Sequence, residues 1–152
     1  MGSFGGTTWK SFFAAAPWIL LATIYISFHA NALNALLLGE AEAGHLGFNL
    51  QSLKLRLIVA TALSVGAAVA VTGIIGFVGL VVPHLLRLVV GPDYRVLLPG
   101  SALMGAILLM AADLIARTIV VPAELPIGII TAVLGGPFFL WLLMRRQFRL
   151  ES

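Results

Sequence analysis

Charged residues divide the chain into long uncharged windows. A helix needs about 20 mainly apolar residues to cross the hydrocarbon core of a bilayer. The windows near or above this length are Ser11–Gly39 with its apolar centre Phe12–Phe28, Leu57–Leu86, Val96–Ala112 with a continuation to Arg117, and Leu125–Met144. The pattern predicts an all-α polytopic membrane protein in which residues 1–152 form a single transmembrane domain.

The second window is too long for one crossing. As a single helix it would measure roughly 45 Å. Gly73, Gly76 and Gly79 interrupt its apolar run. We therefore predict one span over Leu57–Ile75, followed by a short second span or re-entrant segment over Gly79–Val90.

The positive residues favour five crossings over four. Five crossings place seven Lys and Arg residues on one side and two on the other, whereas four crossings give six and three. Because the positive side is usually cytoplasmic, we expect an external N-terminus and a cytoplasmic C-terminus. An external N-terminus without a basic leader favours a missing upstream half, with translocation of a short tail as the alternative.

Composition excludes several classes of protein. Only 10% of the residues are charged and 61% are hydrophobic, whereas soluble domains carry roughly 25% charged residues. A soluble enzyme domain and a disordered tail are therefore excluded. The net charge of +3 is too small for a surface that tracks nucleic-acid phosphates. The chain has no cysteine, so it has neither disulfides nor a thiolate metal site.

The chain also lacks the usual catalytic motifs. No G-x-x-x-x-G-K-[ST] phosphate loop is present, since the only lysines are Lys10 and Lys54. The histidines His29, His45 and His84 are far apart in sequence, so we predict no metal site and no cofactor. Without catalytic motifs the chain is not expected to be an enzyme. Energy for transport would have to come from a partner subunit or an ion gradient.

Several blocks in order resemble one family. They are GFVGLVVPHLLR at 76–87, GPDYRVLLP at 91–99, ADLIAR at 112–117, ELPIG at 124–128 and TAVLGGPFF at 131–139. Together they resemble the permease subunits of ABC importers for iron-siderophores, haem and cobalamin. The resemblance covers the C-terminal half of a ten-helix permease. It implies a bacterial inner-membrane protein that works with a separate ATP-binding subunit, a periplasmic binding protein and a second permease copy, without nucleic acid.

Residues 31–54 form the only substantial polar loop, and the charge bias makes it cytoplasmic. In the family that the chain resembles, the matching loop forms short coupling helices that dock on the ATPase. We assign this role to Gly39, Glu40, Ala43, Leu46 and Gly47. Gly47 is expected to end the docking helix with a positive φ angle. The alternative is an ordinary solvated loop.

The short segment after the glycines carries three motif residues to which we give structural roles. Pro83 removes one backbone hydrogen bond and bends the helix. His84 caps that break or sits at the cytoplasmic surface. Arg87, together with Arg95, flanks the following turn and anchors it among lipid headgroups, with a contact to the ATPase as a further option.

Asp113 and Arg117 are four residues apart, so they share a helix face. Charges inside a membrane are costly and usually functional. One interpretation is a self-neutralising pair. The resemblance implies another, in which Arg117 meets a glutamate of the binding protein while Asp113 orients it.

The last two blocks are expected near the external mouth and along the last crossing. Glu124 lies between Pro122 and Pro126, which forbid a continuous helix. Thr131, Gly135, Gly136 and Pro137 are expected to face the translocation path of a dimer. The alternative is that these small residues only pack helices together.

Two other functions stay open beside that of the importer permease. The first is half of a secondary transporter driven by an ion gradient, which would place ionisable residues near the midplane. Here the acidic residues gather near helix ends and loops, which argues against it. The second is a membrane scaffold subunit that does not transport.

Overall fold

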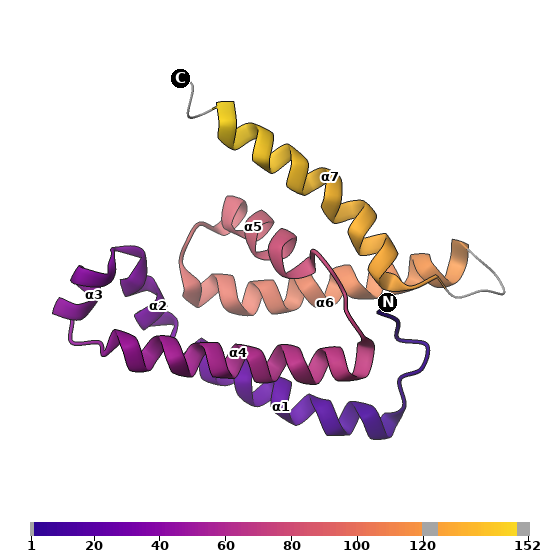
Figure 1. Cartoon of the computed structure of the whole chain (residues 1–152), viewed down its shortest axis with the longest axis horizontal. Coiled ribbons are helices and arrows are strands. Elements are labelled where there is room, and N and C mark those ends of the chain that lie inside the picture. The colour runs from indigo at the N-terminus through magenta and orange to yellow at the C-terminus, as the bar shows by residue number, and fades with distance from the viewer. Residues whose placement is uncertain (1, 120–124, 149–152) are drawn as a thin grey trace.

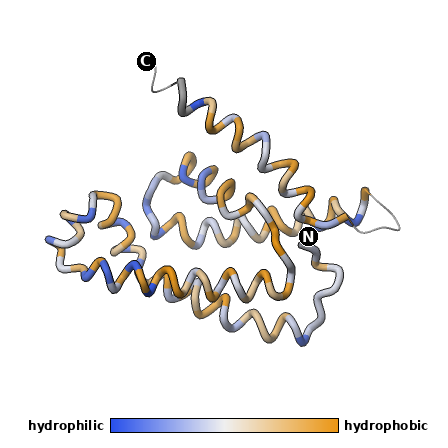
Figure 2. The backbone as a smooth tube through the Cα atoms, in the orientation of Figure 1, coloured by the Kyte–Doolittle hydropathy of each residue, from blue (hydrophilic) through white to orange (hydrophobic). Residues whose placement is uncertain are grey.

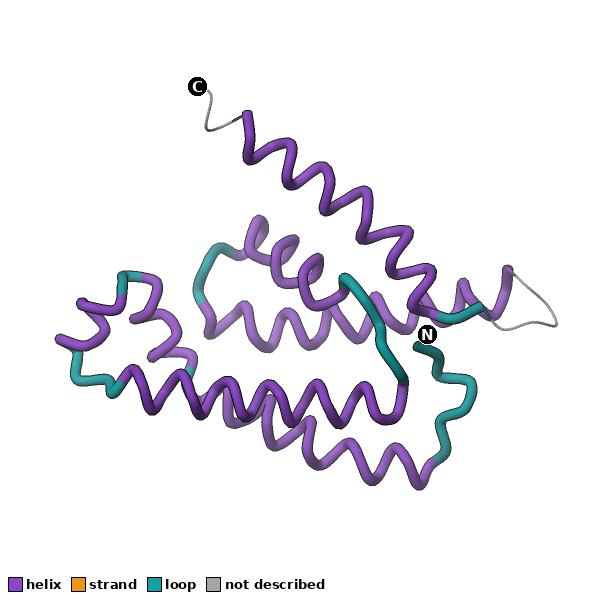
Figure 3. Tube along the Cα trace, in the orientation of Figure 1, coloured by secondary structure: helices purple, strands orange, loops and turns teal. Residues whose placement is uncertain are grey.

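The computed structural model describes residues 2–119 and 125–148. Within these ranges the chain forms seven α-helices and no strand (Figure 1; Figure 3). The helices are α1 (Trp9–Phe28), α2 (Ala30–Leu37), α3 (Glu40–His45), α4 (Leu50–Thr72), α5 (Val78–Val90), α6 (Tyr94–Ile119) and α7 (Ile127–Phe148). The predicted all-α class is confirmed.

Four helices, α1, α4, α6 and α7, are long and apolar enough to cross a membrane. α5 has only 13 residues, or about 20 Å of helix, which is shorter than the hydrocarbon core of roughly 30 Å. The non-helical segment Gly73–Phe77 precedes it and turns at both ends, since Gly73 and Phe77 have φ angles of 72° and 66°. The break predicted from the glycines is confirmed, and the fifth passage stays a prediction.

The long segments run between two ends of the molecule (Figure 1). At one end lie α2, α3 and the turn between α5 and α6; this is the α3 end. At the other lie residues Gly2–Phe4, the linker Gly73–Phe77 and the first turn of α7; this is the linker end. From α1 to α6 the direction alternates between these ends, as a multi-pass topology requires.

Helix packing is close because the buried residues are small. α1 packs along α4, α5 packs along α6, and α7 contacts both α5 and α6. Nearly all of the buried positions in α1 to α4 are alanines, which let helix backbones approach where no hydrophobic force separates helix from lipid. A small core cluster of Ala112, Ala116 and Ile127 joins α6 to α7.

The large apolar side chains point outward instead. Trp9 is 77% exposed and Val89 is 82% exposed. Figure 2 shows hydrophobic residues along the long helices and hydrophilic ones gathered at the α3 end and the turn between α5 and α6. This inverted distribution suits a protein whose solvent is hydrocarbon over most of its length.

Two predicted boundaries are wrong, each for a local reason. α4 begins at Leu50 rather than Leu57 because the Asn49 side chain accepts a hydrogen bond from the Ser52 backbone N–H and caps the helix. It ends at Thr72 because Gly73 takes a φ of 72°. The predicted loop 31–54 contains α2, α3 and the first turn of α4, so only its short connections are loops.

Candidate functional site

α3 is a short helix held between two glycines. Gly39 precedes it with a φ of 112°, and Gly47 follows it with a φ of 87°. Both values lie where residues with a Cβ are strained. The positive φ predicted for Gly47 at the end of this helix is therefore confirmed.

One face of α3 packs inward and the other is open. Ala43 is fully buried, whereas Glu42 and Leu46 are exposed. Glu40 forms an ion pair with Lys54 of α4. The helix thus presents a thin, partly acidic outer face and is tied to the start of α4.

A polar cluster joins α2 to the turn between α5 and α6. The Asn34 side-chain amide donates to Asp93 Oδ1 at 2.7 Å, and its carbonyl oxygen accepts from the Tyr94 backbone N–H at 2.8 Å. Arg95 Nε donates to Asn31 Oδ1 at 2.7 Å. These residues, Asn31, Asn34, Asp93, Tyr94 and Arg95, are named the α2–α6 clamp below.

Asp93 is held in its ionised form by this cluster. The Arg95 backbone N–H donates to Asp93 Oδ1 at 2.9 Å. This bond, and then the Asn34 amide, lower the pKa of the carboxyl group below its ordinary value. Asp93 also starts α6, because its backbone carbonyl accepts from the N–H groups of Val96 and Leu97.

Sequence reasoning assigned Arg87 and Arg95 to headgroups and missed Asn31, Asn34 and Asp93 as a cluster. Arg87 lies over the Tyr94 ring at 5.9 Å, reaches its hydroxyl at 3.4 Å and stays exposed, so its predicted place among headgroups stays a prediction. The sequence contains only a weak indication of this cluster. Two asparagines three residues apart share a face of the short helix, but their partners are about sixty positions away.

Among the motif residues of α5, His84 contacts α7. Pro83 lies inside the helix. His84 is half-buried, and its ring packs edge-on against Phe138 at 5.9 Å. His84 therefore contacts α7 within the chain, and the break that it was expected to cap lies before α5 rather than at Pro83.

Residues proposed for the translocation path divide between two surroundings. Thr131 and Gly135 are buried, and a Cβ at position 135 would lie 2.3 Å from the Phe77 Cβ. Gly136 has nothing within 4 Å of such a Cβ, and Pro137 is exposed. The structure thus puts the first two in internal packing and leaves the second two on the open side of α7.

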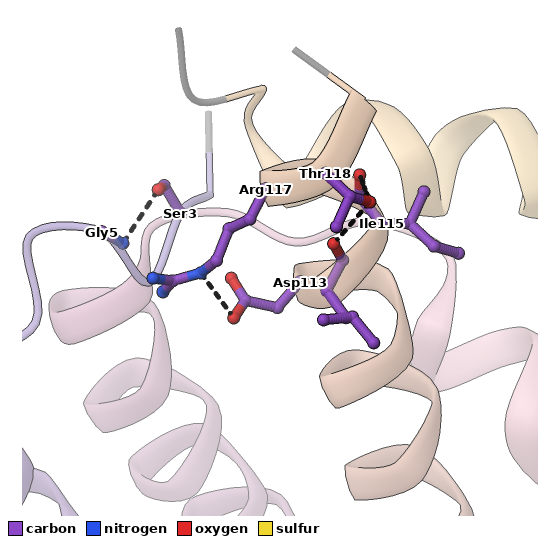
Figure 4. Close-up of polar contacts among 7 residues, drawn as sticks. Ser3, Gly5, Asp113, Ile115, Arg117 and Thr118 are labelled. Atoms are coloured by element: carbon purple, nitrogen blue, oxygen red, sulfur yellow. Dashed lines mark hydrogen bonds and ion pairs between the residues drawn. The ribbon is translucent and has the colours of Figure 1, made fainter. Parts of the chain in front are cut away.

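Asp113 and Arg117 form the ion pair that their spacing predicts. Arg117 Nε donates to Asp113 Oδ2 at 2.9 Å, and Figure 4 shows the guanidinium beside the segment that carries Ser3 and Gly5. The Arg117 side chain is 51% exposed and that of Asp113 is 26% exposed. The pair therefore leaves part of the guanidinium available to another acceptor.

Of the remaining motif positions, the structure describes Pro126, which lies at the linker end. Pro126 immediately precedes α7, and its carbonyl accepts from the Ile129 N–H at 3.0 Å. Glu124 lies outside the described residues. Among residues 2–119 and 125–148, no group of three or more His, Asp or Glu side chains could hold a metal ion.

Backbone groups hold the linker end together. Gly2 N–H donates to Ile74 O at 3.0 Å, Ser3 N–H donates to Thr72 O at 2.8 Å, and Gly128 N–H donates to Gly2 O at 3.4 Å. A Cβ on Gly2 would come within 2.7 Å of the Ile74 carbonyl oxygen. Sequence reasoning missed this junction because backbone bonds leave no side-chain pattern.

The comparisons with known proteins agree on one kind of molecule. The model of the FecCD transport family matches residues 1–145. The hemin transport system permease protein HmuU of Yersinia pestis is 52% identical over 147 residues, which are 97% of this chain and 44% of the relative. The vitamin B12 import system permease protein BtuC of Vibrio cholerae is 48% identical over 147 residues, again 97% of this chain and 44% of the relative. The chain thus spans less than half the length of these relatives.

A solved structure shares the fold as well. It is an inward-facing conformation of a metal-chelate type ABC transporter, with a TM-score of 0.88 and 36% identity over 95% of this chain and 46% of that one. The relatives are transport permeases. Together with the apolar helices, they point to a membrane-spanning protein.

Proposed function

Because this chain belongs to the FecCD transport family, we propose that it is the second half of an ABC importer permease and forms part of the membrane path for a metal chelate. The observation that carries the proposal is the match over residues 1–145 together with 52% identity to a haem permease. The substrate class follows from the same relatives, which are named for haem and vitamin B12. Haem, cobalamin and iron-siderophores are the candidates.

α3 is proposed as the element that docks on a separate ATP-binding subunit. Its support is the geometry: a short exposed helix between two positive-φ glycines, with Ala43 fixing one face and Glu42 and Leu46 presented on the other. ATP hydrolysis would occur on the partner, so this chain would do no bond chemistry. Gly39, Glu40 and Gly47 would set the orientation of the helix.

The opposite end is proposed to receive a periplasmic binding protein. Arg117 is half exposed and keeps donors beyond its bond to Asp113, so a glutamate of the partner could bind there. Gly136 and Pro137, on the open side of α7, would face the path formed with a second permease copy. This arrangement makes the linker end external and the α3 end cytoplasmic, as the positive-residue bias favours.

Transport in a chimera tests the proposed function. This chain would replace the matching 147 residues of the Yersinia pestis haem permease, and the chimera would be reconstituted with the other subunits of that system. ATP-dependent uptake of haem is expected, with cobalamin as the competing cargo. A well-folded chimera that binds the ATP-binding subunit but moves neither chelate would contradict the proposal.

Accessibility of single cysteines tests the orientation. The chain has no native cysteine, so Ser3→Cys and Gly44→Cys each report one site. Ser3 lies at the linker end and Gly44 in α3. An impermeant thiol reagent should label only Ser3→Cys in intact spheroplasts. Labelling of both from outside would contradict the proposed topology.

A further inference from the structure

We infer that the α2–α6 clamp is the positioning element through which a displacement of α3 reaches α5 and α6. This inference rests on the proposed docking of α3 on an ATPase. The clamp residues make no contact with a chelate or a nucleotide in this proposal. They act by making α2 and the start of α6 move as one body.

The argument begins with how weakly α2 is otherwise held. α2 has eight residues, and an isolated helix of that length does not persist in water. A single residue, His29, separates it from α1, and two residues separate it from α3. One of those two is Gly39, whose φ of 112° marks a joint. The chain connections alone therefore leave the direction of α2 poorly fixed.

Contacts with α6 fix that direction. α2 packs against α6, and its alanines Ala30, Ala32 and Ala35 are buried. Asn34 then uses both halves of its amide, since it donates to the Asp93 carboxylate and accepts from the Tyr94 N–H. A side chain bound through donor and acceptor at once resists rotation as well as separation. Arg95 adds a third bond one turn away, to Asn31.

The clamp also reaches α5. Arg87, near the end of α5, lies over the Tyr94 ring, and α5 packs along α6 and against α7. A displacement of α3 can therefore be transmitted through α2 and the clamp to α5, α6 and α7. A second route leads from α3 into α4 through Gly47 and the Glu40–Lys54 pair. Because of the clamp, a displacement of α3 moves α6 as well as α4.

Exchanging the amide at position 34 and the carboxylate at position 93 gives a direct test of the clamp. Asn34→Asp sets a second carboxylate against Asp93, so an attractive bond becomes a repulsion. Adding Asp93→Asn restores a donor, because the new amide can donate to the carboxylate introduced at position 34 and its oxygen can still accept from the Arg95 N–H. Asp93→Asn alone keeps an acceptor for Asn34 and should have a small effect. Gln51→Glu is the matched control, since it adds the same charge at an exposed position of α4 near the same end.

The first measurement uses the chain itself in lipid nanodiscs. Spin labels at Ala41→Cys in α3 and Leu103→Cys in α6, both exposed, report the distance between these two helices. Asn34→Asp should broaden the distance distribution, the double variant should narrow it again, and Gln51→Glu should leave it unchanged. An unchanged distribution in Asn34→Asp would overturn the inference, and so would a broadening that the double variant fails to reverse.

The second measurement separates coupling from stability. In the chimera described above, Asn34→Asp should lower the amount of chelate moved per ATP hydrolysed several-fold, with normal membrane insertion, and adding Asp93→Asn should restore it. Equal loss of uptake and of ATP hydrolysis, or loss of insertion alone, would show a merely structural role and overturn the inference. Absence of uptake in the unsubstituted chimera is instead a failure of the proposed function, and the distance measurement then still decides on the clamp.

Discussion

The α3 end and the linker end join distant segments by different means. At the α3 end the bonds come from side chains: Asn34 to Asp93, Arg95 to Asn31 and Lys54 to Glu40. At the linker end they come from backbone groups of Gly2, Ser3 and Gly128. Side-chain bonds hold separate helices to one another so that they can move together, whereas backbone bonds tie the chain segments directly. The first end is therefore suited to moving as one body and the second to holding a fixed frame.

Glycine has a different task at each end. At the α3 end, Gly39 and Gly47 supply positive φ angles with open space around them. At the linker end Gly73 also takes a positive φ, but Gly2, Gly128 and, farther along α7, Gly135 allow close approach of another part of the chain. The α3 end therefore fails when its conformation is restricted, whereas the linker end and the adjoining part of α7 also fail when space is filled. The following predictions rest on that distinction.

Gly135→Ala is expected to have the largest effect. Its Cβ would meet the Phe77 Cβ, which cannot move aside because Phe77 itself holds a φ of 66° before α5. Overpacking of this kind costs about 1–3 kcal/mol of unfolding free energy. Denaturant unfolding in nanodiscs, followed by tryptophan fluorescence, should show the loss.

The neighbouring Gly136→Ala is the matched control. Nothing lies within 4 Å of its Cβ position, and alanine favours a helix over glycine by about 1 kcal/mol. Stability should stay the same or rise. If Gly136→Ala destabilises the chain as much as Gly135→Ala, the close approach at Phe77 is not the reason.

Gly47→Ala comes next and should act locally. A left-handed conformation costs a residue with a Cβ about 1–2 kcal/mol, so the end of α3 should open more often. Hydrogen exchange of the α3 amides should quicken while those of α6 stay protected. Gly44→Ala is the control, because Gly44 lies within α3 without a positive φ. Equal exchange in the two variants would show that the conformation of Gly47 does not hold the helix.

The Asp113–Arg117 pair is the exception at the linker end, since it is made of side chains. Because both groups are partly exposed, an i,i+4 pair of this kind contributes only about 0.3–0.5 kcal/mol. A double-mutant cycle with Arg117→Ala and Asp113→Ala should return a coupling of that size. A much larger coupling energy would favour a purely internal role, whereas weak coupling with impaired binding-protein docking by Arg117→Glu would favour the proposed docking role.

The smallest effect is expected from pH. The Arg95 N–H and the Asn34 amide lower the Asp93 pKa below 3.8, and Arg95 is the charged group that faces it. The ionised contact is therefore fully present above the ordinary pKa and is lost as pH falls through the lowered value. The spin-label distance between α3 and α6 should stay constant from pH 8 to 5 and change only slightly in stronger acid, as with Asp93→Asn, because the neutral group still offers Asn34 an acceptor. Broadening near neutral pH would point to another group.

Local patterns in the sequence predicted much of this structure. The break after α4 followed from three glycines in an apolar window, and the Asp113–Arg117 pair followed from helical spacing. The short helix α3 and the positive φ of Gly47 followed from a family resemblance read together with glycine chemistry. In each case the residues that decide the structure lie within a few positions of one another.

Contacts between distant positions could not be predicted in the same way. Asn34 and Asp93 are 59 positions apart, and neither residue type alone indicates a partner. The predicted polar loop 31–54 includes most of α2, because eight residues with two asparagines are too short for a periodic pattern to stand out, and α2 packs against α6. The packing of Gly135 against the interior likewise depends on where Phe77 lies.

The N-terminal segment belongs with the linker rather than with the first helix. The linker Gly73–Phe77 follows the end of α4, and residues Gly2 and Ser3 supply donors to the carbonyls of Ile74 and Thr72. Removing these two residues while keeping α1 would leave both carbonyl groups without their backbone donors. Two stretches that are neighbours in sequence therefore serve different parts of the fold: α1 packs along α4, whereas Gly2 and Ser3 complete the break between α4 and α5.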